Sequence, residues 1–261
     1  PMLGRLPKSR SLMVNKGFRN LGVRATLENL KGLHFEYPVG VSIGKTNTDL
    51  HKTREEAVLD IFEGFKNAEE SRVPFSYYEL NISCPNLKGS IEFYEPGHLD
   101  ELLREIARIA IARPIFIKMP ISKTDAEIRG MMEVITQYPK IKAVILGNLE
   151  RNRSNPALRE EEVQKFPQGN FSGLPCQKRS DELIAQVYKE FGAKIKIIGC
   201  GGIFSAEDSY RKIKRGASLV QLITGLVFEG PQLVSHVNRA FADFLKRDGY
   251  SSIHEAIGTY S

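Results

Sequence analysis

The stretch KIKIIGCGGIFS, residues 194–205, predicts a strand, a turn and the start of a helix in direct succession. Residues 194–198 form a short run rich in isoleucine, which is typical of a buried strand. The glycines in residues 199–202 suit a tight turn, because glycine reaches backbone conformations that other residues avoid. Ser205 is a good helix N-cap. A strand that leads through a glycine turn into a helix is the repeating unit of parallel α/β folds.

The same unit recurs along the chain. Apolar, β-branched runs predict strands at residues 38–43, 77–82, 114–118, 142–146, 194–198 and 219–223. Amphipathic runs predict helices at about residues 53–69, 99–111 and 231–246, and others starting near 124, at about 181 and after Ser205. Thr53 with Glu56, and Thr124 with Glu127, match the capping box that marks a helix start.

Strict strand–helix alternation is compatible with two architectures. One is a closed barrel with eight strand–helix units, and the other is a doubly wound open sheet, which can stop at six. Polar or glycine-rich clusters follow nearly every predicted strand, at residues 44–45, 83–86, 118, 147–148, 199–202 and 224–225. A site supplied by every strand end is the barrel arrangement. We therefore predict an α/β fold, a (β/α)8 TIM barrel with about six βα units in this chain, as a single domain over residues 1–261.

Composition excludes several classes of protein. The chain has 261 residues, 41% hydrophobic and 26% charged, which argues against disorder. Its net charge of +6 is spread along the chain, so nucleic-acid binding is not expected. No apolar run is long enough for a membrane helix, and the start lacks the apolar core of a secretory leader. The three cysteines show no metal spacing, so we expect no metal site and a reducing cytoplasm.

Residues 81–86, Asn-Ile-Ser-Cys-Pro-Asn, are the most specific chemical signal. They follow a predicted buried strand, where loops carry function. Amide side chains donate and accept together, which suits a planar ring with carbonyl and N–H groups. The thiol of Cys84 can act as a general base where its surroundings favour the thiolate. The alternative is a structural cysteine beside a Pro-Asn turn.

Three further segments are candidates for ligand binding. Lys118 ends an apolar strand, where a charge needs a partner such as an anionic ligand or an electron-rich ring. Gly199, Gly201 and Gly202, together with Gly225 on the neighbouring strand, allow a phosphate to approach the backbone. Residues 169–173 lie in a long polar segment that could form a lid over the site. The alternatives are a surface lysine, ordinary βα turns and a surface excursion.

Together these stretches resemble dihydroorotate dehydrogenase, an FMN-dependent barrel family of pyrimidine synthesis. The matching residues are 40–45, 81–86, 117–118, 147–148, 172–173, 198–202, 217–222 and 255–258. The resemblance implies oxidation of dihydroorotate to orotate, with hydride transfer from C6 to flavin N5. By position, Cys84 would remove the C5 proton, and Asn81, Asn86 and Asn148 would hold the substrate ring.

The resemblance also implies where the cofactor binds. Lys118 would lie near flavin N1 and the C2 carbonyl and stabilise the charge of the reduced ring. The FMN phosphate would be held by Gly201, Gly202, Thr224 and Gly225, with Ser172 and Gly173 nearby. The electron acceptor is left open between quinone and fumarate. A homo-oligomer is also left open, and the location is cytoplasmic, or peripheral to a membrane if an N-terminal extension anchors the chain.

Several positions depart from the family pattern. The first two barrel strands have no counterpart, so the domain is expected to be N-terminally incomplete. Ser42 stands where the family has Asn, Leu149 replaces a hydroxyl residue, and the segment around Asn15 is shortened. Cys84 resembles the soluble branches, whereas residues 255–258 resemble the membrane-associated branch. Two alternatives follow, a flavin reductase for another dihydropyrimidine and a non-catalytic remnant.

Overall fold

The computed structural model describes residues 1–89 and 91–260 and contains a six-stranded sheet and a three-stranded sheet. The order in the larger sheet is β3-β4-β5-β6-β8-β9, which follows the chain once β7 is set aside. A doubly wound sheet reverses its strand order at a switch point, and this sheet does not. The predicted barrel class is therefore confirmed, with six strands of a (β/α)8 barrel present in the described residues.

The chain divides into two compact units, which we describe separately. One unit consists of Gly17–Lys118 and Thr124–Ala143, and we call it the central unit. The other consists of Pro1–Lys16, Met119–Lys123 and Val144–Ser261, and we call it the C-terminal unit. Strand β6 (Ile141–Leu146) passes from the first to the second.

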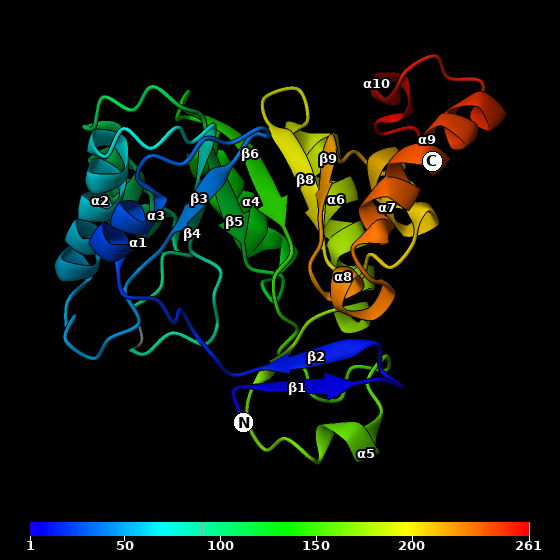
Figure 1. Cartoon of the computed structure of the whole chain (residues 1–261), viewed down its shortest axis with the longest axis horizontal. Coiled ribbons are helices and arrows are strands. Elements are labelled where there is room, and N and C mark those ends of the chain that lie inside the picture. Colours follow the sequence, from blue (N-terminus) through cyan, green and yellow to red (C-terminus); the bar gives the residue numbers. More distant parts are fainter. Residues whose placement is uncertain (90, 261) are drawn as a thin grey trace. The chain divides into compact units, whose positions relative to one another are not determined.

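In the central unit, helices cover parallel strands (Figure 1). Its strands are β3 (Gly40–Ile43), β4 (Tyr77–Asn81) and all but the last residue of β5 (Ile115–Met119). Its helices are α1 (Val23–Leu30), α2 (Arg54–Glu70), α3 (Pro96–Ala107) and α4 (Asp125–Ile135). Both predicted capping boxes are present, at Thr53–Glu56 and Thr124–Glu127, so α2 and α4 begin where the sequence indicates.

The C-terminal unit combines a parallel strand pair with a second, antiparallel sheet. Strands β8 (Lys196–Cys200) and β9 (Leu219–Gln221) pair in parallel. The antiparallel sheet has the order β1-β2-β7, formed by β1 (Leu3–Leu6), β2 (Ser11–Val14) and β7 (Asn170–Phe171). The helices are α5 (Glu160–Val163), a 3-10 turn (Leu174–Cys176), α6 (Gln177–Phe191), α7 (Ala206–Lys214), α8 (Thr224–Glu229), α9 (Gln232–Asp248) and α10 (Ile253–Ala256).

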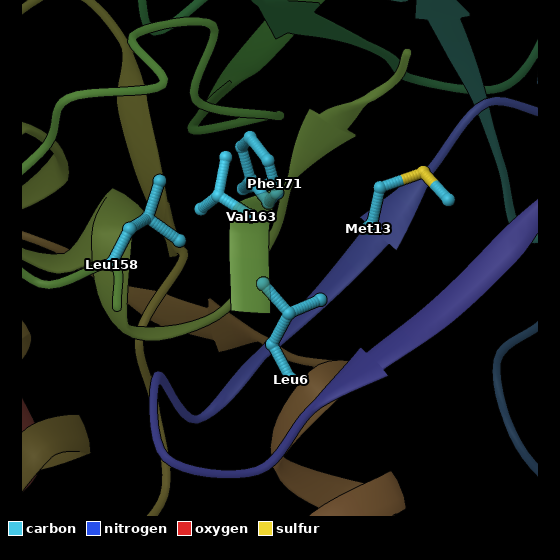
Figure 2. Packing of buried hydrophobic residues seen from close by; sticks show 5 residues of the cluster. All are labelled: Leu6, Met13, Leu158, Val163 and Phe171. Atoms are coloured by element: carbon cyan, nitrogen blue, oxygen red, sulfur yellow. The ribbon is translucent and has the colours of Figure 1, made fainter. Parts of the chain in front are cut away.

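A small hydrophobic core joins the N-terminal hairpin to the long segment after β6. Figure 2 shows its five members, which come from the two hairpin strands, from the segment near α5 and from β7: Leu6, Met13, Leu158, Val163 and Phe171. All five are buried. The segment over residues 149–180, for which the sequence left a lid or a surface excursion open, is therefore a packed part of this unit.

Glu162 fastens the hairpin turn to α5. Its carboxylate accepts hydrogen bonds from the Ser9 amide at 2.8 Å, the Ser9 hydroxyl at 2.7 Å and the Lys8 amide at 3.0 Å. Burial raises the pKa of the Glu162 carboxyl, but these hydrogen bonds outweigh it and hold the pKa below its usual value.

We expect Glu162→Gln to lower the free energy of unfolding by about 1–3 kcal/mol at neutral pH, because a buried charged acceptor is lost. The folded-state pKa lies below the unfolded one, so this stabilisation is present above the unfolded value of about 4.3 and is lost as the pH falls through the folded value. Urea unfolding at pH 7 and at pH 3.5 measures both effects. The neighbouring Glu161 pairs with Lys8 at the surface, so Glu161→Gln is the control, and equal losses in both variants would contradict the assignment.

The predicted strands and helices are all present, with different ends. The helix predicted over residues 99–111 runs over Pro96–Ala107 instead, because Pro96 is favourable in the first turn. The helix predicted from about 181 begins at Gln177, where a preceding 3-10 turn supplies the start. Strands β1, β2 and β7 were not predicted, because short antiparallel strands carry little periodic signal.

Candidate functional site

The loop that follows β4 is organised by Asn81, the last residue of the strand. The Asn81 side-chain oxygen accepts from the Ser83 amide at 3.2 Å and from the Ser83 hydroxyl at 3.0 Å. These bonds form a turn directly after the strand. Both acceptor sites of the Asn81 amide are thus engaged within the protein, so Asn81 can offer a ligand only its N–H.

A buried carboxylate lies beneath this amide. Glu79, on β4, is buried and accepts a hydrogen bond from the Asn81 side-chain nitrogen at 3.3 Å. Ser42, opposite it on β3, donates its hydroxyl hydrogen to the same Glu79 oxygen at 2.6 Å. Glu79 fixes which end of the Asn81 amide carries the donor, because a carboxylate only accepts. Ser42, where the family has Asn, is committed to this contact.

Cys84 and Lys118 occupy neighbouring strand ends of the central unit. Lys118 pairs in register with Asn81 across β4 and β5. Cys84 lies three residues beyond Asn81, at the turn that contains Asn86, and is half-buried. Parallel strands present their carboxyl ends on one side of a sheet. Asn81 and Lys118 therefore lie side by side at the carboxyl edge of the sheet, and the loop that carries Cys84 and Asn86 begins at that edge.

Lys45 anchors the loop that carries Cys84. Its ammonium group is buried and donates to the carbonyl oxygen of Lys88 at 2.8 Å. The Lys88 amide in turn donates to the Asn47 side chain at 2.8 Å. Burial lowers the pKa of Lys45, although Asp60 and Asp49 partly oppose it. Two contacts from the loop after β3 thus restrain the far end of the loop after β4.

In the C-terminal unit, the residues expected to hold a phosphate lie together. The Thr224 hydroxyl donates to the Ser172 hydroxyl at 2.8 Å. A Cβ at Gly173 would lie 2.9 Å from the Thr224 methyl group, and one at Gly225 would lie 2.1 Å from the carbonyl oxygen of Ile203. Segments that are far apart in sequence therefore converge, and glycine is required where their backbones meet.

The loop after β8 offers unused backbone donors there. Gly201 and Gly202 have φ values of 108° and 69°, which only glycine adopts readily. Ile203 is buried, and its N–H donates to no acceptor within residues 1–89 and 91–260. An unpaired N–H in a buried residue is rare, and such a group is normally satisfied by a ligand or an ordered water. This loop, with the neighbouring Thr224 hydroxyl and the close approach at Gly225, fits an anionic group such as a phosphate.

Asn148, the last of the predicted site residues, also belongs to the C-terminal unit. Asn148 follows β6, and its carbonyl oxygen is 3.1 Å from the Cys176 sulfur. Cys176 is fully buried, and burial raises the pKa of its thiol to about 12. This thiol stays protonated at neutral pH and cannot serve as a base.

Sequence reasoning missed Glu79, and a signal for it existed. The strand YYELN contains a charge two residues before Asn81, on the same face. A charge inside an apolar strand needs a partner, which was the argument applied to Lys118. Gln177 and Asp208 were also missed, because their contacts with the loop after β8 depend on tertiary packing.

Strands in sequential order, with polar groups at their carboxyl ends, place the fold in the (β/α)8 barrel class. The model of the family described as dihydroorotate dehydrogenase matches residues 1–245. The chain belongs to this family, whose members are oxidoreductases that act on a CH–CH bond. This membership confirms the resemblance stated from the sequence.

Relatives align along nearly the whole chain. A dihydroorotate dehydrogenase (quinone) of Trichodesmium erythraeum is 33% identical over 99% of this chain and 69% of its own length. One of Anaeromyxobacter dehalogenans is 31% identical over 99% of this chain and 70% of its own length. A crystal structure of the Eimeria tenella enzyme in complex with ferulenol has a TM-score of 0.86 at 24% identity, covering 99% of this chain and 74% of that one.

Neither a metal-binding cluster nor a membrane-spanning helix is present in the described residues. Across residues 1–89 and 91–260, no group of three His, Cys, Asp or Glu side chains is placed to hold a metal ion. Over the same residues, no helix has the length and apolar character needed to cross a membrane.

Proposed function

We propose that this chain oxidises dihydroorotate to orotate in pyrimidine biosynthesis with FMN as its cofactor. The observation that carries the proposal is the unpaired, buried N–H of Ile203 beside Gly202, Thr224 and Gly225. This arrangement fits the phosphate of FMN, and the family membership supports the reaction.

In this proposal, Cys84 is the general base. Its thiolate takes the proton from C5 of dihydroorotate, and the electrons of that C–H bond form the C5=C6 double bond. When bound, FMN would supply the two-electron acceptor for the hydride that leaves C6. The products are orotate, a protonated Cys84 and the two-electron-reduced cofactor.

The amides of Asn81, Asn86 and Asn148 hold the ring of the substrate. Asn81 donates to a carbonyl or carboxylate oxygen, because its own oxygen is engaged by Ser83. Lys118 would help to hold the cofactor ring and would supply positive charge that stabilises its reduced form. Ser172, Gly173 and Gly201 complete the surroundings of the phosphate.

A quinone is the proposed electron acceptor. The relatives described above carry this acceptor in their names, and their alignment covers 99% of the chain. Fumarate is the alternative acceptor. It is favoured by the presence of Cys84, because a cysteine at this position resembles the soluble branches of the family. The proposed location is cytoplasmic, or peripheral to a membrane.

The test begins with protein freed of flavin and titrated with FMN. We expect FMN to bind and its spectrum to bleach on anaerobic addition of dihydroorotate. A soluble quinone, and not fumarate, should restore the colour. Failure to take up FMN would support the non-catalytic remnant and overturn the proposal.

Dihydrouracil is the comparison substrate. It has the same ring without the carboxylate, and the departures at Ser42 and Leu149 motivate the comparison. Faster bleaching by dihydrouracil than by dihydroorotate would assign the chain to the reduction of another pyrimidine. Faster bleaching by dihydroorotate supports the proposed substrate.

A further inference from the structure

The loop that follows β8 contains two glycines and has little conformational preference of its own. Side chains of α6 and α7 hold it in place. Gly201 and Gly202 both have positive φ values, and glycine imposes little preference between peptide orientations. The glycines alone therefore do not fix the orientation of the peptide plane between Gly202 and Ile203. Its orientation decides whether the Ile203 N–H faces the phosphate position or points elsewhere.

Gln177 fixes that orientation. It lies at the first position of α6, and its side-chain nitrogen donates to the Gly202 carbonyl oxygen at 2.5 Å. In a trans peptide the carbonyl and the next N–H point in opposite directions. Holding the Gly202 oxygen against α6 therefore aims the Ile203 N–H away from α6. A Cβ at Gly202 would lie 2.3 Å from the Gln177 Cβ, so the two segments are in close contact.

Asp208 holds the other side of the same loop. One carboxylate oxygen accepts from the Phe204 amide at 3.0 Å, and the other accepts from the Gln177 side chain at 3.0 Å. The Phe204 N–H is thereby committed to α7, while the N–H of Ile203 is left without an acceptor among the described residues. One carboxylate thus orients both Gln177 and the loop.

A partly buried ion-pair network supports Asp208. Arg211 bridges Asp208 and Asp181, with both contacts at 2.8 Å. Asp181 also pairs with the fully buried Lys212 at 2.7 Å. Lys212 donates to the Ser180 hydroxyl at 2.9 Å, and that hydroxyl donates to the Leu146 carbonyl oxygen at 3.1 Å. The network therefore runs from the end of β6 to the loop after β8.

We infer that Gln177 and Asp208 are positioning residues that lock the Gly202–Ile203 peptide with its N–H aimed at the cofactor phosphate. They touch no reacting atom and act through the loop. The inference rests on the proposed function, because it takes the phosphate of FMN as the ligand of this loop. It adds to that function that side chains of α6 and α7 orient the backbone N–H that recognises the phosphate.

The test compares FMN with riboflavin, which lacks the phosphate, on flavin-free protein. Gln177→Met keeps the length of the side chain and removes its donor. We expect the Kd for FMN to rise about tenfold, equivalent to about 1.4 kcal/mol, with the Kd for riboflavin unchanged. Quenching of flavin fluorescence measures both constants. Gln164→Met, at an exposed site on the same unit, is the matched control and should change neither.

The outcomes separate the inference from the function. Wild-type protein that binds FMN no more tightly than riboflavin overturns both the phosphate site and the inference. Tight wild-type FMN binding, with equal or no losses for the two ligands in Gln177→Met, overturns the inference alone. If that variant does not fold, Asp208→Asn replaces it, with the same selective loss of FMN affinity expected and the same equal losses overturning the inference.

Discussion

Replacing Cys84 by alanine should slow the reduction of bound flavin by dihydroorotate about 10²–10⁴-fold, the usual contribution of a general base. Binding of FMN should stay within about twofold, because the proposed phosphate contacts are backbone and hydroxyl groups of the other compact unit. Anaerobic stopped-flow absorbance gives the reduction rate, and flavin content after gel filtration gives the binding.

A second variant tests the role of the thiol itself. In wild-type protein the reduction rate should rise with pH as thiolate forms. In Cys84→Ser this rise should disappear, since a serine hydroxyl does not ionise in the same range, and a reduced rate should remain. Equal loss of flavin content and reduction rate in Cys84→Ala would show a structural cysteine instead. Cys176 cannot substitute as base, because burial raises the pKa of its thiol to about 12.

Breaking the Lys212–Asp181 pair should cause the largest loss of stability. The Lys212 ammonium group is fully buried, and its contact with Asp181 is 2.7 Å. Asp181→Asn leaves that charge without its carboxylate, which typically costs about 3–5 kcal/mol. Urea unfolding at neutral pH measures the loss. Glu182→Gln, one residue further along α6 and half-exposed, is the control and should cost less than about 1 kcal/mol.

The loss should depend on pH in a defined direction. Burial already lowers the pKa of Lys212, and Asp181 opposes that effect. Without Asp181 the folded-state pKa falls further below the ordinary lysine value of about 10.4. Between the two values the unfolded chain binds more protons, so the stability of the variant rises with pH. A deficit that stays constant from pH 7 to pH 10 would contradict this account.

A double variant separates the pair from its surroundings. Asp181→Leu combined with Lys212→Met removes both charges and fills the space with apolar side chains. Such replacements are often neutral or stabilising. We therefore expect the double variant to recover most of the free energy of unfolding that Asp181→Asn loses. Failure to recover would mean that Asp181 matters chiefly through Arg211 and not through Lys212.

The sequence determined the repeating unit and many of the proposed site residues. The periodicity of apolar residues, the capping boxes and the glycine turns are local signals. The strands of the larger sheet could therefore be predicted in order: β3, β4, β5, β6, β8 and β9. The chemistry of residues 81–86 and of Lys118 was visible for the same reason: each lies directly after a strand. The sheet order then follows, because each parallel strand needs its own crossover helix.

Tertiary structure alone decided how segments far apart in sequence are held, both in the N-terminal hairpin and in the proposed site. Ser9 with Glu162, Ser42 with Glu79 and Gln177 with Gly202 are hydrogen-bonded across 153, 37 and 25 residues. Neither partner in such a pair carries a periodic signal, because side-chain contacts at that separation depend on how whole elements pack. Local residue order sets which groups reach a strand end, and packing sets which way those groups point.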